Sequence, residues 1–264
     1  MRRIFLLTVF CFACLMVGAQ SVRLMSYNIH NAVGMDKVRD YDRLAKVIRQ
    51  FHPDMVAIQE LDSVTHRSKG DDVLDELAQR TKMRAFYAPA IDYDGGKYGI
   101  GILAKKKPVA IYRYSLPGRE ERRALICVEF KKMVFCCTHL SLTKADRMAS
   151  LKIIQDVASR YKGLKPVFVA GDFNDVPDSP LVQGLLSDFQ FLTDLSQPTF
   201  PAPAPKETID YIVAQKDASK MFLVKEAVVV DEPVASDHRP VFVKVRVGKH
   251  VNPQVRHSLY LQSL

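Results

Sequence analysis

The stretch PVFVAGDFN, residues 166–174, decides the fold because an apolar, strand-like run ends there in polar residues. Its first half is a short apolar run with branched and aromatic side chains, which is typical of a buried strand. Its second half places Asp172 and Asn174 directly after that strand. The same pattern recurs along the chain, and it predicts a sheet protein whose polar strand ends gather at one rim.

Ten further runs share this short apolar or alternating character, and we expect them to be strands. They are residues 23–29, 54–61, 84–91, 99–104, 109–114, 124–130, 132–140, 208–214, 226–231 and 240–247. Apolar residues recur at helical spacing in 44–51, 73–78 and 145–161. So many strands with so few helices do not fit an alternating parallel sheet. Two sheets packed face to face, with helices outside, would bury one face of every helix. We therefore predict one layered α/β domain.

The chain opens with MRRIFLLTVFCFACLMVGAQ, in which two arginines precede an apolar stretch and two small residues. This layout is typical of a secretory signal peptide that is cleaved before Gln20. The apolar stretch is shorter than the roughly 20 residues that a membrane-spanning helix needs. We expect residues 1–19 to be removed and the protein to be exported, to the periplasm or the extracellular space. The domain then covers residues 20–248, and residues 249–264 form a peripheral tail.

Charge and cysteine content narrow the class of protein further. Without the two arginines of the leader, the formal net charge falls from +9 to +7. Such a charge favours polyanionic partners, such as nucleic acid or an anionic lipid surface, but it selects none of them. Cys127, Cys136 and Cys137 lie in strand-like runs, and their odd number predicts buried thiols rather than a disulfide framework. Closely spaced prolines in residues 198–206 predict a surface loop within the domain.

Polar residues that could bind a metal or take part in catalysis stand at the ends of the expected strands. They are Asn28, Glu60, His139, Asp172, Asn174, Asp210, Asp237 and His238. Each of them alone fits a turn or a cap. The set as a whole supplies the parts of a metal-dependent phosphoester hydrolase.

Three requirements of that chemistry match these residues. Mg²⁺ prefers oxygen ligands with one or two carboxylates, which Glu60 with Asn28 or Asp237 would provide. The attacking water needs a base, and a histidine held by a carboxylate suits that task, as His238 with Asp210 would. Negative charge grows on the phosphoryl oxygens in the transition state, and the donors that would meet it are Asn174 and His139.

Seven blocks in series resemble the ordered signature of the endonuclease/exonuclease/phosphatase superfamily. They are SYNIH at 26–30, IQELD at 58–62, YGIGILAKKKP at 98–108, CTHLS at 137–141, GDFND at 171–175, TIDYIV at 208–213 and SDHRP at 236–240. That superfamily includes deoxyribonuclease I, apurinic endonucleases, inositol polyphosphate 5-phosphatases and neutral sphingomyelinases. The resemblance spans nearly the whole chain after residue 19. It implies a four-layered α/β/β/α sandwich of two mixed sheets with outer helices, and phosphoester hydrolysis with Mg²⁺, or with Mn²⁺ as the alternative.

The resemblance also implies roles on the metal side of the site. Glu60 resembles the principal metal ligand, with Asn28 beside it. Asp237 resembles a carboxylate that lies on the metal or next to it. Asp172 and Asn174 resemble the pair that orients the nucleophile and contacts the phosphate.

On the catalytic side, His238 resembles the catalytic histidine that Asp210 orients. His139 resembles the second histidine of the family, which contacts the phosphate or assists the leaving group. Two assignments of the base stay open: His238 itself, or Asp172 with His238 as an electrostatic stabiliser. Arg123, with its neighbour Arg122, precedes the strand at 124–130, where a guanidinium could contact a phosphate with two hydrogen bonds. A solvated run of charges is the competing interpretation.

The expected activity is therefore that of an exported nuclease or phosphodiesterase. Hydrolysis of a phospholipid, sphingomyelin or an inositol phosphate is the first alternative. A binding protein that keeps the fold but has lost turnover is the alternative from another class. The expected partner is a phosphoester substrate, with nucleic acid among the candidates. No stable protein partner is implied, and we expect a monomer.

Overall fold

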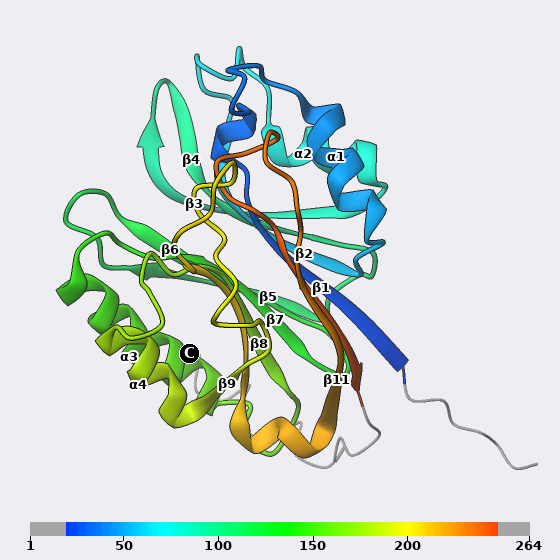
Figure 1. The fold of residues 1–264 in the computed structure, drawn as a ribbon, viewed down its shortest axis with the longest axis vertical. Coiled ribbons are helices and arrows are strands. Elements are labelled where there is room, and N and C mark those ends of the chain that lie inside the picture. Colours follow the sequence, from blue (N-terminus) through cyan, green and yellow to red (C-terminus); the bar gives the residue numbers. More distant parts are fainter. Residues whose placement is uncertain (1–19, 248–264) are drawn as a thin grey trace, which may run out of the picture.

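The computed structural model of the protein describes residues 20–247, in which two six-stranded sheets lie face to face (Figure 1). The first sheet has the order β11-β12-β1-β2-β4-β3, with β11 (Phe222–Val229), β12 (Val241–Val247), β1 (Gln20–Asn28), β2 (Met55–Ser63), β4 (Gly96–Ala104) and β3 (Arg84–Tyr93). The second has the order β5-β6-β7-β8-β10-β9, with β5 (Ala110–Leu116), β6 (Arg123–Glu129), β7 (Val134–His139), β8 (Val167–Asp172), β10 (Asp210–Gln215) and β9 (Phe189–Phe191). The expectations for residues 1–19 and 249–264 lie outside the described residues.

Four α-helices cover the outer faces of the two sheets (Figure 1). They are α1 (Tyr41–Gln50), α2 (Val73–Thr81), α3 (Lys144–Ser159) and α4 (Pro180–Asp188). Apolar side chains of α1 and α2 pack on the first sheet, and those of α3 and α4 pack on the second. A third apolar cluster fills the space between the sheets, with Leu24, Ile102, Phe135, Phe168 and Val243 among its members. Helix, sheet, sheet and helix thus form the four-layered sandwich that was predicted. Within residues 20–247, no helix is long and apolar enough to cross a membrane.

Each of the eleven expected strands overlaps an observed one, but β9 and α4 were not predicted. Strand β9 has three residues, which is too short for an alternating pattern. Helix α4 does carry a start signal: the side chain of Ser179 accepts a hydrogen bond from the backbone of Val182, and Pro180 occupies the first turn. The three cysteines are buried and free, as expected. Cys127 and Cys136 lie directly opposite each other on β6 and β7.

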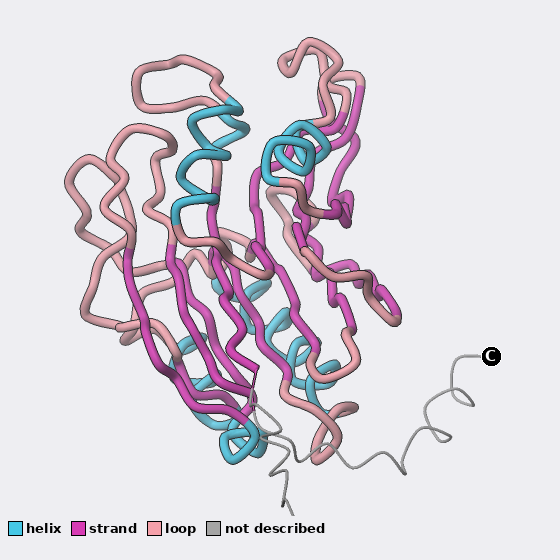
Figure 2. The backbone as a smooth tube through the Cα atoms, turned by 90° about the vertical axis from the view of Figure 1, so that its right-hand side faces the viewer, coloured by secondary structure: helices cyan, strands magenta, loops and turns pink. Residues whose placement is uncertain are grey.

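The strand directions bring the polar strand ends to one rim. In the first sheet β1 is parallel to β2, and β12 is antiparallel to β1. In the second sheet β7 is parallel to β8, while β6 and β10 run opposite to them. The carboxyl ends of β1, β2, β7 and β8 therefore meet the amino ends of β6, β10 and β12. Figure 2 shows long loops beyond this edge of the sheets.

Gly171 allows β8 to approach β7 closely at this rim. A β-carbon on Gly171 would lie 2.0 Å from the carbonyl oxygen of Thr138. The pairing one residue further along places His139 beside Asp172.

We therefore expect Gly171→Ala to lower the free energy of unfolding by about 1–3 kcal/mol, because the strands must move apart. Chemical denaturation measures this change. The control is Gly184→Ala in α4, where the new methyl meets only the end of the flexible Leu151 side chain and alanine favours the helix. A Gly171→Ala protein as stable as the control would show that the close approach is not required.

Candidate active site

His238 and Asp210 form a buried pair that joins the two sheets at the rim. The Nδ1 atom of His238 lies 2.9 Å from Oδ2 of Asp210, and the same oxygen accepts a hydrogen bond from the hydroxyl of Thr199 at 2.6 Å. The Ser236 hydroxyl donates to the carbonyl of Asn28 at 2.8 Å and accepts from the backbone N–H of His238 at 3.3 Å. The turn before β12 is thereby tied to the end of β1. The structure brings His238 and Asp210 together as the sequence predicts.

The proline-rich loop, residues 198–206, packs over this pair. The ring of Phe200 lies 4.7 Å from the imidazole of His238, measured between centroids. Thr199 and Ala202 are fully buried, so the expectation of a surface loop is wrong for this part of it. The cause is backbone hydrogen bonding: the Thr199 carbonyl accepts from Arg239 N–H, and Ala202 N–H donates to the Asp237 carbonyl. Thr199 and Phe200 are site residues that sequence reasoning missed.

Asn28 connects two carboxylates across the sheets. Its Nδ2 atom lies 3.0 Å from Oε1 of Glu60 and 3.0 Å from Oδ2 of Asp172. Its Oδ1 atom accepts from the backbone N–H of His30 at 3.1 Å. An amide nitrogen has two hydrogens, so both are used by these carboxylates. Asn28 therefore lies beside Glu60 as expected, but it directs its nitrogen, not its oxygen, toward the acids.

The backbone at Glu60 is held in an unfavourable conformation. The register between β2 and β4 shifts between Ile58 and Leu61, and Glu60 within this bulge has a φ of +61°. The left-handed region costs a residue with a β-carbon roughly 1–2 kcal/mol, and bulges re-aim side chains beside functional sites. Strain of this kind persists where the surrounding structure enforces it, and it clusters at active sites. The bulge supports a functional role for the Glu60 carboxylate.

Asp172 occupies the centre of the polar network. Its Oδ1 atom accepts from the backbone N–H of Asn174 at 2.8 Å. Its Oδ2 atom lies 3.6 Å from Nε2 of His238 and 3.6 Å from Nε2 of His139. Burial raises the pKa of Asp172, while the neighbouring His238 opposes that rise. Asn174 has a φ of +50° and donates its side-chain amide to the Leu140 carbonyl at 2.8 Å, which fixes the turn after β8.

The two histidines carry different charges. Burial lowers the pKa of His238, but the carboxylates of Asp210 and Asp172 outweigh it and raise that pKa to about 10. His238 is therefore an imidazolium at neutral pH. Burial lowers the pKa of His139, and the positive charges of Arg123 and His238 lower it further. His139 is therefore neutral.

Arg123 determines which nitrogen of His139 carries the proton. Its Nη1 atom lies 3.2 Å from Nδ1 of His139, and because arginine has only donors, that nitrogen must be the acceptor. The hydrogen of His139 is then on Nε2, the atom that faces Asp172. Arg123 is buried and forms an ion pair with Glu121 at 2.7 Å, so the solvated charge run is wrong for this residue. Its neighbour Arg122 is exposed.

Asp237 stands apart from this network. Its Oδ1 lies 3.3 Å from the Ser236 hydroxyl, whose single hydrogen is directed at the Asn28 carbonyl, 2.8 Å away. The atoms that come together as potential cation ligands belong to Asp172, Asp210 and His238, and they lie within 4.8 Å of one another. In that group, however, Nδ1 of His238 is hydrogen-bonded to Asp210, so this nitrogen carries a proton and is not free to bind a cation. The Glu60 carboxylate, which Asn28 orients at the strained bulge, is the better oxygen donor for a hard cation.

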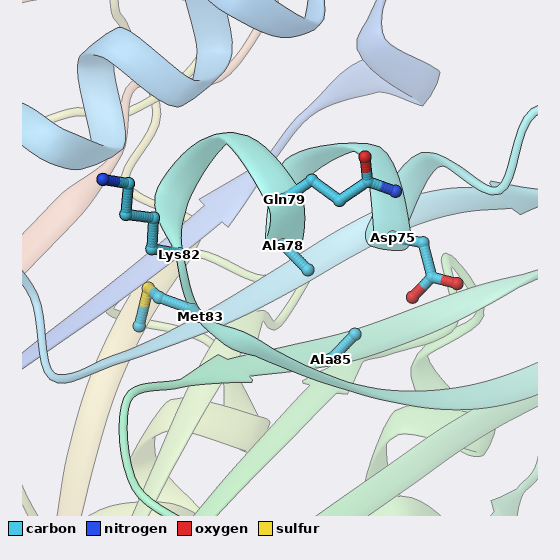
Figure 3. A pocket seen from close by; sticks show the side chains of 6 residues that line it. All are labelled: Asp75, Ala78, Gln79, Lys82, Met83 and Ala85. Carbon is cyan, nitrogen blue, oxygen red and sulfur yellow. The ribbon is translucent and has the colours of Figure 1, made fainter.

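A separate hollow of about 470 Å³ lies beside α2 and the start of β3 (Figure 3). It is lined by Asp75, Ala78, Gln79, Lys82, Met83 and Ala85. None of the residues of the polar network contributes to it. The site is the open rim of the sandwich and not this hollow.

Comparison with known proteins assigns the class. Residues 25–238 match the family model described as Endonuclease/Exonuclease/phosphatase family. The chain belongs to this family, whose members are hydrolases that act on phosphoester bonds and generally depend on a divalent metal.

Individual relatives agree with this assignment. The uncharacterized protein YbhP of Escherichia coli (strain K12) is 28% identical over 221 residues, which cover 75% of this chain and 86% of YbhP. An endonuclease/exonuclease/phosphatase from Bacteroides vulgatus has a TM-score of 0.71 at 18% identity, covering 86% of this chain and 99% of that one. A mannosyl-6-phosphatase from Bacteroides thetaiotaomicron VPI-5482 has a TM-score of 0.67 at 18% identity, covering 85% and 99%. At these identities the solved structures show the shared fold.

The strain at Glu60 yields a prediction that separates stability from activity. Glu60→Gly should be more stable than Glu60→Ala by about 1 kcal/mol, because only glycine adopts the left-handed conformation without cost. Both variants should lose activity, because both lack the carboxylate. Chemical denaturation and a phosphodiesterase assay measure the two effects.

The control is the same pair of substitutions at Ser63, also in β2, where no positive φ occurs. There the alanine variant should be the more stable one. Equal stability of the two Glu60 variants would contradict the assignment of strain to this residue.

Proposed function

We propose that the protein is a divalent-metal-dependent hydrolase that directs water at a phosphodiester. The observation that supports this most strongly is the continuous network from Glu60 through Asn28 and Asp172 to His238 and Asp210. It combines carboxylate oxygens for a hard cation, a carboxylate with a raised pKa and a positively charged imidazole. These are the groups that phosphoester hydrolysis by water requires.

Glu60 is the principal residue that would hold the cation. Its carboxylate lies at the strained bulge, half-buried, and its Oε1 is oriented by the Asn28 amide. Asp237 is the carboxylate that precedes His238 in the sequence, and we assign it to the same task on the basis of the family resemblance. When bound, a divalent cation supplies positive charge for the phosphoryl oxygens and lowers the pKa of a water ligand.

Asp172 is the group that we assign to accept the proton of the attacking water. It is buried, its pKa is raised, and its Oδ2 faces both histidines. His238, held as an imidazolium between Asp210 and Asp172, stabilises the negative charge that develops on the phosphoryl group. Of the two assignments left open by the sequence, we favour the one with Asp172 as base, because His238 already holds a proton.

His139 and Asn174 complete the phosphate-facing side. The neutral His139 carries its proton on Nε2, so it can donate a hydrogen bond to a phosphoryl oxygen. Asn174 keeps one amide hydrogen beyond the bond that it gives to Leu140. Arg123 acts by fixing the ring of His139, and its guanidinium is occupied by Glu121 as well.

For the substrate, we propose a soluble phosphodiester, with nucleic acid as the leading candidate. The formal charge of +7 after loss of the leader favours a polyanion. Export, which follows from the leader alone, would place that substrate outside the cytoplasm. A panel of plasmid DNA, RNA, inositol phosphates, sphingomyelin and phosphorylated sugars tests this choice, and cleavage of the nucleic acids is the expected result. Turnover of none of them would favour a binding protein on the same fold.

Removal of His238 tests the mechanism. His238→Ala should reduce hydrolysis of bis-p-nitrophenyl phosphate in the presence of Mg²⁺ by at least about 100-fold, because the charge opposite the phosphoryl group is lost. Chelation with EDTA should abolish the wild-type activity, and Mg²⁺ or Mn²⁺ should restore it. The matched control is His66→Ala, which removes an exposed histidine. Metal-independent turnover, or full activity of His238→Ala, would overturn the proposal.

Thr199 provides a test of how the pair of His238 and Asp210 is positioned. Thr199→Val removes the hydroxyl that donates to Asp210, and it should lower kcat about 10-fold, the equivalent of one hydrogen bond to a charged group. KM should change little, since Thr199 contacts Asp210 rather than the substrate. Thr199→Ser keeps the hydroxyl and should retain the wild-type kcat. Equal losses in the valine and serine variants would mean that the methyl group, not the hydrogen bond, matters.

A further inference from the structure

Five strands meet at a second hollow, at the end of the sandwich opposite the site. Val22 of β1, Met55 of β2 and Val247 of β12 line it from the first sheet. Phe130 and Met133 line it from the turn that joins β6 to β7 in the second sheet. Strands rise about 3.3 Å per residue, so the six residues from Val22 to Asn28 separate this hollow from the catalytic rim by about 20 Å.

Residues at the edge of the core between the sheets form the wall of the hollow. All five apolar residues belong to the inter-sheet cluster, and each of them is at most 8% exposed. The hollow measures about 260 Å³. At roughly 30 Å³ for each group of the size of a water molecule, it holds about eight such groups in a row or cluster. An apolar chain fits this shape and surface better than a polar ligand does.

Lysines surround the opening. Lys106 comes from the loop between β4 and β5, and Lys131 and Lys132 come from the turn between β6 and β7. All three are exposed, and within residues 20–247 none of them has an ion-pair partner. Asp54 also lines the hollow, but it already accepts from the backbone of Arg23 and pairs with Lys105 at 3.7 Å. The opening therefore carries uncompensated positive charge.

We propose that this end of the sandwich docks on the surface of an anionic lipid bilayer. One acyl chain enters the hollow, and the three lysines contact the phosphate groups of neighbouring lipids. Apolar protein surface buried at the acyl boundary and lysines attracted to anionic headgroups both strengthen the binding of peripheral proteins to membranes, the lysines by about 1 kcal/mol each. A polyanion such as nucleic acid would use the lysines but would leave the apolar wall without a partner.

This docking would turn the catalytic rim away from the bilayer. The strands that end at the hollow begin or end at the site, so the two lie at opposite ends of the same strands. Substrates would then reach the site from the aqueous phase. The inference is independent of the proposed function, because none of the hollow's residues belongs to the catalytic network.

The experiment uses residues 20–264, which include every described element and lack the apolar leader. The chain has no tryptophan, so Phe130→Trp places a single fluorescent reporter in the hollow. With vesicles of phosphatidylcholine and about one third phosphatidylglycerol, its emission should shift to shorter wavelength, and lipids brominated on the acyl chain should quench it. Vesicles of phosphatidylcholine alone should produce neither effect.

Removal of the three lysine charges at the opening provides a second test. In co-sedimentation with the same anionic vesicles, the triple variant Lys106→Gln, Lys131→Gln and Lys132→Gln should lose about 100-fold in apparent partition coefficient. The control replaces three other exposed lysines, Lys46, Lys152 and Lys225, with glutamine and should lose little. The circular dichroism spectrum and the denaturation midpoint should be unchanged in both variants, which shows that they are folded.

Three outcomes would overturn the proposal. The first is equal binding of the two triple variants, and the second is binding without quenching of the reporter. The third is quenching only in a chain that ends at Val247, which would identify residues 248–264 as the occupant of the hollow instead of a lipid.

Discussion

The hydrogen bond between His238 and Asp210 requires both sheets to be in place. His238 precedes β12 of the first sheet, and Asp210 begins β10 of the second. The hydrogen bond from Asn28 to Asp172 crosses the same interface. No single sheet contains the site, so its geometry depends on the apolar cluster that holds the sheets face to face. A change in that core would therefore reach the catalytic network by moving the sheets relative to each other.

Much of the fold was predictable because strand periodicity is a local signal. All eleven expected strands exist, and the excess of strands over helices correctly indicated two sheets with outer helices. Strand β9 was not predicted because three residues show no period. Helix α4 was not predicted, although Ser179 and Pro180 mark its start. The order of the strands within each sheet was not predictable in this way, because it depends on contacts between residues far apart in the sequence.

The site was predictable as a set of residues but not as a set of contacts. Asn28, Glu60, Asp172, Asp210, His139 and His238 do lie together at one rim. Nothing local indicated that Asn28 directs its nitrogen toward two acids, or that Arg123 is buried against His139. Thr199 and Phe200 were missed for a related reason. Proline spacing indicates a loop, but only the packed structure shows which side chains of that loop turn inward.

The buried charges at the rim balance one another, and this balance constrains the chemistry. Asp210 and Asp172 are both buried, and the imidazolium between them offsets the cost of removing acids from water. His139 cannot share that role, because Arg123 already places a positive charge against it and lowers its pKa. The pair of histidines is thus divided into a charged and a neutral member by their neighbours. Asp172 Oδ2 thus has a charged and a neutral histidine as neighbours, each at 3.6 Å. A phosphoryl group with growing negative charge would meet both of these donors.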